Sequence, residues 1–276
     1  MTCAVSGGVD STALVVLAVA AELRVTAVHV DHGVRAGSAA EADVVATTAA
    51  RLGAAFRAER VALEPGPNLE ARARDARYAV LPADVLTGHT ADDQAETVLA
   101  NMLRGAATSG LAAMRPGYRR PLLALRRAET EALCATLGLP TVDDPSNADP
   151  RHLRNRVRHE LLPLMTEIAR RDPVPILVRQ ADLARSEHDL LEELAAALDP
   201  TDARGLAAAP EPLARRAIRR WLTTTHPPDL ATVDRVLVVA RGSATATDVG
   251  DGRRVERHRQ RLRIVPAPAA KVSRSD

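Results

Sequence analysis

The first half of the chain alternates short apolar runs with longer stretches of helical composition. β-Branched and apolar residues predict four strands, at residues 2–5, 25–30, 56–61 and 84–88. Apolar stretches without breakers predict helices between and after these strands, at residues 12–23, 41–52, 69–81 and 92–103. This alternation predicts an α/β fold, a parallel sheet with helices on both faces, in which ligands bind at the carboxyl ends of the strands.

The second half has a different pattern. Turn-forming residues accumulate at 140–150, a basic helical stretch follows at 153–165, and Asp172-Pro173-Val174-Pro175 then interrupts the chain. We therefore predict a first domain at residues 1–168 and a small second domain at 173–276. The second domain is predicted to be mainly helical with a little sheet, with helices at 176–198, 213–222 and 230–240, a turn at 248–252 and a strand at 261–265.

Composition then narrows the classes of function. The 276 residues include a single lysine, Lys271, so a Walker A loop is excluded. With 37 basic and 35 acidic residues the net charge is only +2, and four aromatic residues argue against a module that stacks several bases. An RNA partner would be held mainly by arginine and backbone. Cys3 and Cys134 are too few for a disulfide scaffold, and the apolar stretch 13–21 is too short to span a membrane.

The strongest local motif is Ser6-Gly7-Gly8-Val9-Asp10-Ser11, between the first predicted strand and the helix that follows it. The glycines allow close approach of a ligand, the serines add hydroxyl groups, and the helix start offers free N–H groups to a phosphate. Asp10 would repel a phosphate on its own but fits if Mg²⁺ lies between them. The alternative is an ordinary strand–turn–helix connection with a capping side chain.

A second motif, Gly88 to Thr97, also follows a strand and opens a helix. Asp93 and Glu96 are three residues apart, so they share one helix face and could hold a metal or an ammonium group. The alternative is a helix start with favourable acidic residues. His29 and His32 are expected to shape a loop rather than bind a metal, and Cys134 is expected to be a buried small hydrophobe.

Arginines form the third signal, because arginine binds phosphate with two parallel hydrogen bonds and stays charged. Arg77 lies on the third predicted helix, next to Tyr78. Arg151, Arg154, Arg156 and Arg158 crowd one short stretch, and residues 215–220 and 253–263 are basic as well, which would suit a polyanion. The alternative is a solvated basic face in an arginine-rich chain.

These motifs together resemble the tRNA(Ile)-lysidine synthetase family of PP-loop ATP pyrophosphatases. Ser6–Ser11 alone is similar to the signature loop of the whole superfamily. The more specific likeness lies in the order of the other segments, namely His29–Arg35, Thr87–Thr97, Leu103–Gly105, Arg120–Leu123, Asp143–Asn147 and Arg154–Arg158.

The resemblance implies that ATP adenylates the C2 oxygen of the wobble cytidine of tRNA(Ile) and that free lysine then displaces AMP, giving lysidine. It implies ATP binding by Ser6, Gly7, Gly8, Val9, Asp10 and Ser11, with Mg²⁺ at Asp10. Asp10, Arg77 and Arg158 would be catalytic, and Asp93 and Glu96 would bind the lysine. It also implies a tRNA with a CAU anticodon and a tRNA-binding second domain, and it leaves open whether the protein is a homodimer. Because no segment resembles a targeting or membrane element, a cytoplasmic location is the default expectation.

Two other functions are open at this point. One is a different PP-loop enzyme, a tRNA thiolase or a small-molecule amidotransferase, although the paired cysteines typical of the thiolation enzymes are absent. The other is a non-catalytic nucleotide- or RNA-binding protein, which would bind ATP without releasing AMP.

Overall fold

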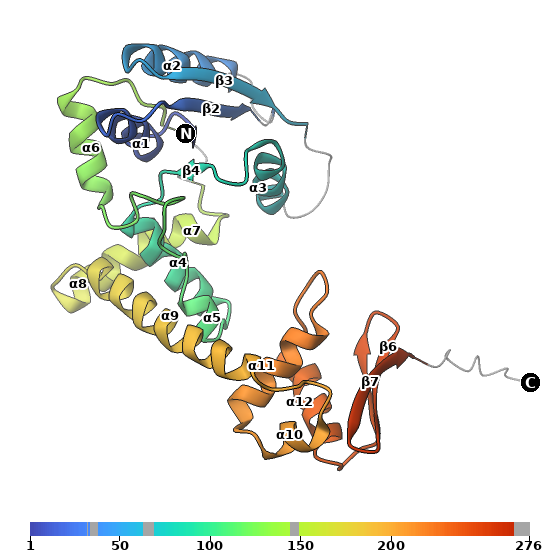
Figure 1. Ribbon diagram of the computed structural model, residues 1–276. Coiled ribbons are helices and arrows are strands. Elements are labelled where there is room, and N and C mark those ends of the chain that lie inside the picture. The colour runs from blue at the N-terminus through green and yellow to red at the C-terminus, as the bar shows by residue number, and fades with distance from the viewer. Residues whose placement is uncertain (32, 34–37, 63–68, 144–148, 268–276) are drawn as a thin grey trace, which may run out of the picture. The chain divides into compact units, whose positions relative to one another are not determined.

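The computed structural model describes residues 1–31, 33, 38–62, 69–143 and 149–267. The chain separates into two compact units, Met1–Arg185 and Ser186–Asp276, whose elements are labelled in Figure 1. The division falls inside the helix α9 (Val174–Ala196), which starts one residue after the predicted beginning of the second domain. The domain limits 1–168 and 173–276 stay a prediction. None of the described helices is both long and apolar enough to cross a membrane.

The first unit is built on a parallel sheet, as predicted. Its strand order is β3-β2-β1-β4, and the strands are β1 (Thr2–Ala4), β2 (Thr26–Asp31), β3 (Ala55–Arg60) and β4 (Leu86–Thr87). Cys3 of β1 lies opposite Ala27 of β2 and Leu86 of β4. The fourth strand is shorter than its predicted range, 84–88. At its end Gly88 lies so close to the first turn of α1 that an added Cβ would be 2.5 Å from the Asp10 carbonyl oxygen.

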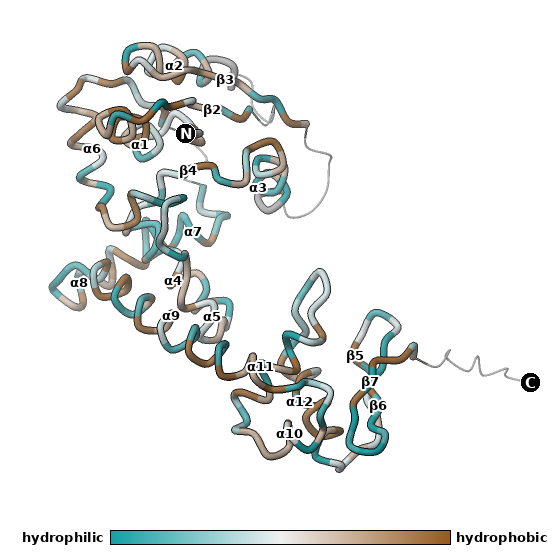
Figure 2. Tube along the Cα trace, viewed as in Figure 1, coloured by the Kyte–Doolittle hydropathy of each residue, from teal (hydrophilic) through white to brown (hydrophobic). Residues whose placement is uncertain are grey.

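Helices cover both faces of this sheet. Cys3 and Ala27 face a core shared with α1 (Val9–Ala20), α2 (Ser38–Arg51) and α6 (Arg127–Thr136), and Cys134 is buried in that core, as predicted. Val28, the next residue of β2, faces the opposite side with the end of α3 (Leu69–Val80). β2 is packed on both faces, which suits the apolar Ala27, Val28 and Val30. It is not apolar throughout, because Thr26, His29 and Asp31 are polar, and Figure 2 shows both brown and teal stretches along it.

A second apolar cluster completes the first unit. It joins α4 (Ala91–Leu103), the segment 153–165 and the beginning of α9 through Ala95, Leu99, Val157, Leu162, Leu177 and Ala181. The helix predicted at 153–165 is not one regular helix. It consists of α7 (Leu153–Arg156), a π-helical turn η2 (Val157–Leu161) and α8 (Leu162–Ala169). Such π turns often occur at functional sites. The short helix α5 (Thr108–Leu111) follows α4.

The second unit packs helices on a small antiparallel sheet. Its helices are α10 (Ala203–Ala208), α11 (Glu211–Leu222) and α12 (Leu230–Ala240), and its strands are β5 (Ala246–Gly250), β6 (Arg253–His258) and β7 (Arg261–Pro266). The sequence predicted a mainly helical unit with a little sheet, and this is confirmed. The core is formed by side chains from both layers, among them Leu206, Ile218, Val233, Val255 and Leu262.

Candidate active site

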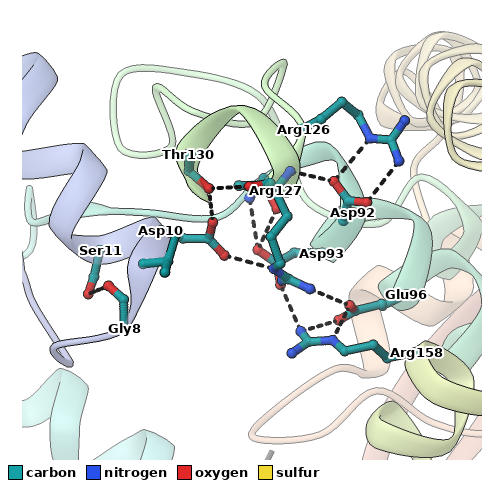
Figure 3. A network of polar contacts seen from close by, with 12 residues as sticks. Gly8, Asp10, Ser11, Asp92, Asp93, Glu96, Arg126, Arg127, Thr130 and Arg158 are labelled. Carbon is teal, nitrogen blue, oxygen red and sulfur yellow. Dashed lines mark hydrogen bonds and ion pairs between the residues drawn. The ribbon is translucent and has the colours of Figure 1, made fainter. Parts of the chain in front are cut away.

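The predicted phosphate-binding turn lies between β1 and α1, at the carboxyl end of the sheet. The Ser6 amide donates to Ser11 Oγ at 3.2 Å, and the Ser11 hydroxyl donates to the Gly8 carbonyl at 2.9 Å, so the turn folds over the start of the helix. Figure 3 shows Gly8 and Ser11 together at this helix start. The first N–H groups of a helix have no intrahelical partner, and they carry its positive dipole end. The turn therefore has the construction of an anion site.

Gly7 cannot be replaced without disturbing this turn. Its φ of +91° favours glycine, and an added Cβ would lie 2.8 Å from Val142 Cγ2. The Val142 amide also donates to the Gly7 carbonyl at 2.9 Å. The close approach of residue 142 therefore requires glycine at this position.

Asp10 turns toward α6. Its Oδ1 accepts from the Thr130 hydroxyl at 2.5 Å, and its Oδ2 accepts from Arg127 Nε at 3.1 Å, as Figure 3 shows. Burial raises the pKa of Asp10 above its usual range, although Thr130 and Arg127 oppose this shift. The carboxylate is thus held by α6 at the edge of the phosphate-binding turn.

Glu96 is completely buried and fully bonded. Its Oε1 accepts from Arg158 Nε at 2.6 Å and from an Arg127 terminal nitrogen at 3.2 Å. Its Oε2 accepts from Arg154 Nε at 2.7 Å and from an Arg158 terminal nitrogen at 3.0 Å. The side chain is only 1% exposed, so its charge depends on these three guanidinium groups.

Asp93, on the same face of α4, is bonded in the same way. Its Oδ1 accepts from Arg127 at 2.9 Å and from Arg154 at 2.8 Å. Its Oδ2 accepts from the Thr90 amide at 2.8 Å and from the Thr90 hydroxyl at 3.1 Å. A carboxylate has about four lone-pair sites. Asp93 and Glu96 therefore both have a full set of donors in this structure.

Burial alone would raise the pKa of Asp93, but Arg154, Arg127 and the Thr90 amide together lower it below its usual range. His89, at the end of β4, shows the opposite balance. Burial lowers its pKa to about 4, and Arg154, Arg120 and Arg74 act in the same direction against Asp93. At neutral pH the site therefore contains an ionised Asp93 beside an uncharged imidazole.

The residue that joins these groups is Arg127, which the sequence analysis missed. Its guanidinium donates one bond each to Asp10, Asp93 and Glu96, and Figure 3 shows it between them. The neighbouring Arg126 forms two parallel 3.0 Å bonds to Asp92 instead. The sequence offered no local signal for Arg127, since its three partners lie 31 to 117 residues away.

The structure brings together most of the predicted site residues. Asp10, Asp93, Glu96 and Arg158 belong to one network, whereas Arg77 lies outside it, on α3, with its guanidinium 5.4 Å from the ring centre of Tyr78. His29 Nδ1 is 3.0 Å from the Val5 carbonyl oxygen, in agreement with a structural role. His32 and residues 34–35 and 144–147 of the predicted motifs lie outside the described residues.

The donor set fits Mg²⁺ only in combination with a ligand. Within the described ranges no three His, Cys, Asp or Glu side chains gather into a metal site. Mg²⁺ is, however, often held by one or two carboxylates together with substrate phosphates. Asp10 lies next to the phosphate-binding turn, and each of its oxygens keeps a second lone pair beyond its bond to Thr130 or Arg127.

The predicted basic clusters of the second unit are partly neutralised within that unit. Their ion pairs are Arg215–Asp234, Arg216–Glu192, Arg253–Asp251, Arg254–Asp248 and Arg261–Asp199. A polyanion would have to compete with these carboxylates, so the count of arginines overstates the positive field of this unit.

Comparison with known proteins gives one family. Residues 1–165 match a model of a PP-loop domain. The chain is 46% identical over 235 residues to the tRNA(Ile)-lysidine synthase of Mycolicibacterium paratuberculosis, covering 79% of this chain and 73% of that protein. It is 41% identical over 270 residues to the synthase of Nocardia farcinica, covering 90% and 85%.

Solved structures of similar fold include the U34-tRNA thiolase NcsA from Methanococcus maripaludis. It aligns with a TM-score of 0.51 and 18% identity, covering 67% of this chain and 72% of that one. At this identity the likeness concerns the fold alone, and it agrees with the predicted α/β sheet.

Removing the Arg127 guanidinium should destabilise the fold. Arg127→Met leaves the buried Glu96 and Asp93 with fewer cations, and we expect it to lower the free energy of unfolding by about 3 kcal/mol. Arg127→Lys should recover part of this loss, because one ammonium cannot reproduce three directed bonds. Urea denaturation measures both variants. Arg156→Met, which removes an exposed pair with Glu160, is the control and should change little. Equal stability of Arg127→Met and the parent chain would contradict the bridging role.

The ionised Asp93 should stabilise the fold in a pH-dependent way. Because its pKa is lowered in the folded chain, its contribution is present above the pKa of an unfolded aspartate, about 3.9, and is lost as pH falls through the folded value. The difference in unfolding free energy between the parent and Asp93→Asn should therefore shrink below about pH 4. Urea titrations from acid to neutral pH test this, with the exposed Asp43→Asn as control. A difference that stays constant with pH would refute it.

Proposed function

The chain belongs to the tRNA(Ile)-lysidine synthase family, and from this membership we propose the roles that its own residues take in the reaction. The enzyme is an ATP-dependent ligase that acts on tRNA(Ile) and lysine. The C2 oxygen of the wobble cytidine attacks the α-phosphorus of ATP and pyrophosphate leaves. An amine of lysine then attacks C2, loses a proton, and AMP leaves.

The observation that carries this proposal is the three-way contact of Arg127. One guanidinium bonds Asp10, beside the phosphate-binding turn, and also Asp93 and Glu96, the pair assigned to lysine. Each of these bonds is about 3 Å long, so the turn and the pair belong to a single site. A cytidine activated at the turn would be within reach of an amine held at the pair, as both steps require.

The turn is proposed to bind the phosphates of ATP. The first amides of α1, with the hydroxyl groups of Ser6 and Ser11, are donors suited to the pyrophosphate leaving group. Gly7 and Gly8 allow the backbone to approach it. Bound Mg²⁺ would neutralise charge on these phosphates, and Asp10 is the residue placed to hold it.

Two arginines are proposed to stabilise negative charge that develops during the reaction. Arg158, bonded to Glu96, stands within the carboxylate network, and Arg77 is a second cation, on α3 beside Tyr78 and outside that network. Burial lowers the pKa of Arg77, but a guanidinium keeps its charge at neutral pH. Fixed cations in a partly buried site act more strongly than the same charges in water.

Lysine can reach the carboxylate pair only if a protein donor withdraws. Asp93 and Glu96 accept full sets of hydrogen bonds, and three arginines supply most of these. Arg127 is the arginine best placed to withdraw, since it already contacts Asp10 beside the turn. ATP phosphates bound at the turn would attract its guanidinium and free one acceptor on each carboxylate for the lysine ammonium.

The structure gives no support to thiolation as the alternative. Cys3 and Cys134 are both buried, and burial raises the pKa of both thiols, to about 11 for Cys3. Reactive cysteines need the opposite environment, partly exposed and with a lowered pKa. We further propose a tRNA with a CAU anticodon, tRNA binding by the second unit, a homodimer and a cytoplasmic location.

Formation of AMP with each substrate omitted in turn tests the reaction. With unmodified tRNA(Ile), ATP and labelled lysine, we expect AMP release to need the tRNA and label to enter the RNA only when all three are present. Asp10→Ala should lower the rate at least about 100-fold, the scale of losing a group that acts in the transition state. Exposed Asp43→Ala is the matched control. ATP binding without AMP release would identify a non-catalytic nucleotide-binding protein instead.

The role of Mg²⁺ has its own readout. Nucleotide affinity measured by calorimetry should depend on Mg²⁺ in the parent chain and lose most of that dependence in Asp10→Ala. An unchanged Mg²⁺ dependence in Asp10→Ala would show that Asp10 does not hold the metal, and it would leave the ligation proposal intact.

If bound ATP displaces Arg127 from the carboxylate pair, ATP and lysine should each increase the affinity of the protein for the other. Calorimetry should find lysine binding at least about fivefold tighter with a non-hydrolysable ATP analogue than without it. In Arg127→Met, whose carboxylates keep free acceptors, lysine should bind without nucleotide and the coupling should be lost. Equal lysine affinity with and without the analogue in the parent chain would show that no arginine has to move.

A further inference from the structure

A second group of arginines lies at the end of β4, beside the site but outside its carboxylate network. The Thr87 amide and hydroxyl donate to the Arg119 carbonyl at 2.9 and 3.1 Å, so the segment that carries Arg119 and Arg120 is fixed to the strand end. Arg74 and Arg77 come from α3, which packs on this side of the sheet, and each guanidinium lies 5.4 Å from the Tyr78 ring centre.

These groups lie near one another. The charges of Arg119 and Arg74 both lower the pKa of Arg120, in addition to burial, while Tyr78 opposes them. His89 is affected by both Arg74 and Arg120, and also by Asp93 of the active site. The imidazole of His89 therefore lies close both to this arginine group and to Asp93.

The arginines of this group have no carboxylate partners among the described residues, unlike the arginines of the active site. Arg127, Arg154 and Arg158 each bond two or three carboxylates. Within the described residues, by contrast, Arg74, Arg77, Arg119 and Arg120 form no ion pair. Among the described residues, the Nε atoms of Arg119 and Arg120 are also buried without a hydrogen-bond partner. Buried donors of this kind are rare in folded proteins and call for an explanation.

An exposed aromatic ring adjoins these cations. Tyr118, which directly precedes Arg119, is 63% exposed. A tyrosine held at a surface among arginines is the combination that binds single-stranded nucleic acid, where cations contact phosphates and the ring stacks on a base. A phosphopeptide would use the cations but would leave this ring without a role.

We propose that Tyr118, Arg119, Arg120 and Arg74 form a docking surface for the single-stranded anticodon loop, which holds the nucleotides flanking the reactive cytidine. The proposal rests on the proposed function, since it takes tRNA as the partner. The arginines bind backbone phosphates, and Tyr118 stacks on one flanking base. His89, which is close to both groups, is uncharged and so does not itself compete for the phosphates or for Asp93.

Binding of the free RNA tests this surface without any chemistry. Affinity for tRNA(Ile) and for its isolated anticodon stem–loop is measured by filter binding over a range of salt concentrations, with no ATP or lysine. Arg74→Gln, Arg119→Gln and Arg120→Gln should each weaken binding severalfold, and each should reduce the slope of log affinity against log salt by about 0.7, the value for one single-strand phosphate contact.

Tyrosine variants separate stacking from charge. Tyr118→Leu should weaken binding about tenfold with no change in the salt slope, and Tyr118→Phe should bind as the parent does, because stacking needs only the ring. Exposed Arg24→Gln is the control for loss of one positive charge elsewhere and should leave the affinity near that of the parent. Thermal unfolding and ATP binding of each variant show that the fold is intact.

The outcomes distinguish this proposal from the ligation itself. If the variants bind RNA as tightly as the parent while lysine-dependent AMP release occurs, the surface is refuted and the ligation stands. If the variants lose RNA binding but the parent forms no lysine-dependent AMP, the surface stands and the ligation is refuted. Failure of the parent to bind the stem–loop, or equal competition by a polyaspartate peptide, would also overturn the docking surface.

Discussion

The negative charge of a carboxylate buried as deeply as Glu96 must be balanced by nearby cations. In the first unit this requirement brings together elements that are far apart in the sequence. The three guanidinium groups come from α6, α7 and the π turn, which lie 31 to 62 residues further along the chain than Glu96 itself. Arg127 extends the same network to Asp10, at the start of α1. Elements that are distant in sequence are thus fixed to the carboxyl end of the sheet by ionic bonds as well as by apolar packing.

Local patterns were enough to predict the framework. The β-branched residues of β2 and the apolar residues of α12 give a clear pattern, and both elements occur within one residue of where they are expected. The turn at Ser6–Ser11 was also found, because glycine and serine there have a local conformational reason. The carboxylate pair on α4 needed only the three-residue spacing of a helix.

Features that depend on tertiary contact could not be found in this way. Arg127 looks like any other arginine of an arginine-rich chain, because its role is set by partners on other elements. The π turn leaves no local signature, and neither does the close approach of Gly88 to α1 just after β4 ends. Nor could the sequence separate arginines paired with acids in the second unit from unpaired ones at the end of β4, since pairing is a property of the fold.

All hydrogen-bond acceptors of Asp93 and Glu96 are occupied, and this limits which substitutions such an enzyme can accept during evolution. In the proposed reaction, the acceptors that select the incoming amine are the same atoms that hold α6, α7 and the π turn in place, so recognition and folding cannot be tuned independently. A substitution that widened the choice of nucleophile would loosen the scaffold, and one that stiffened the scaffold would exclude the nucleophile. Both the selection of the nucleophile and the stability of the fold therefore restrict which amino acids these positions can tolerate.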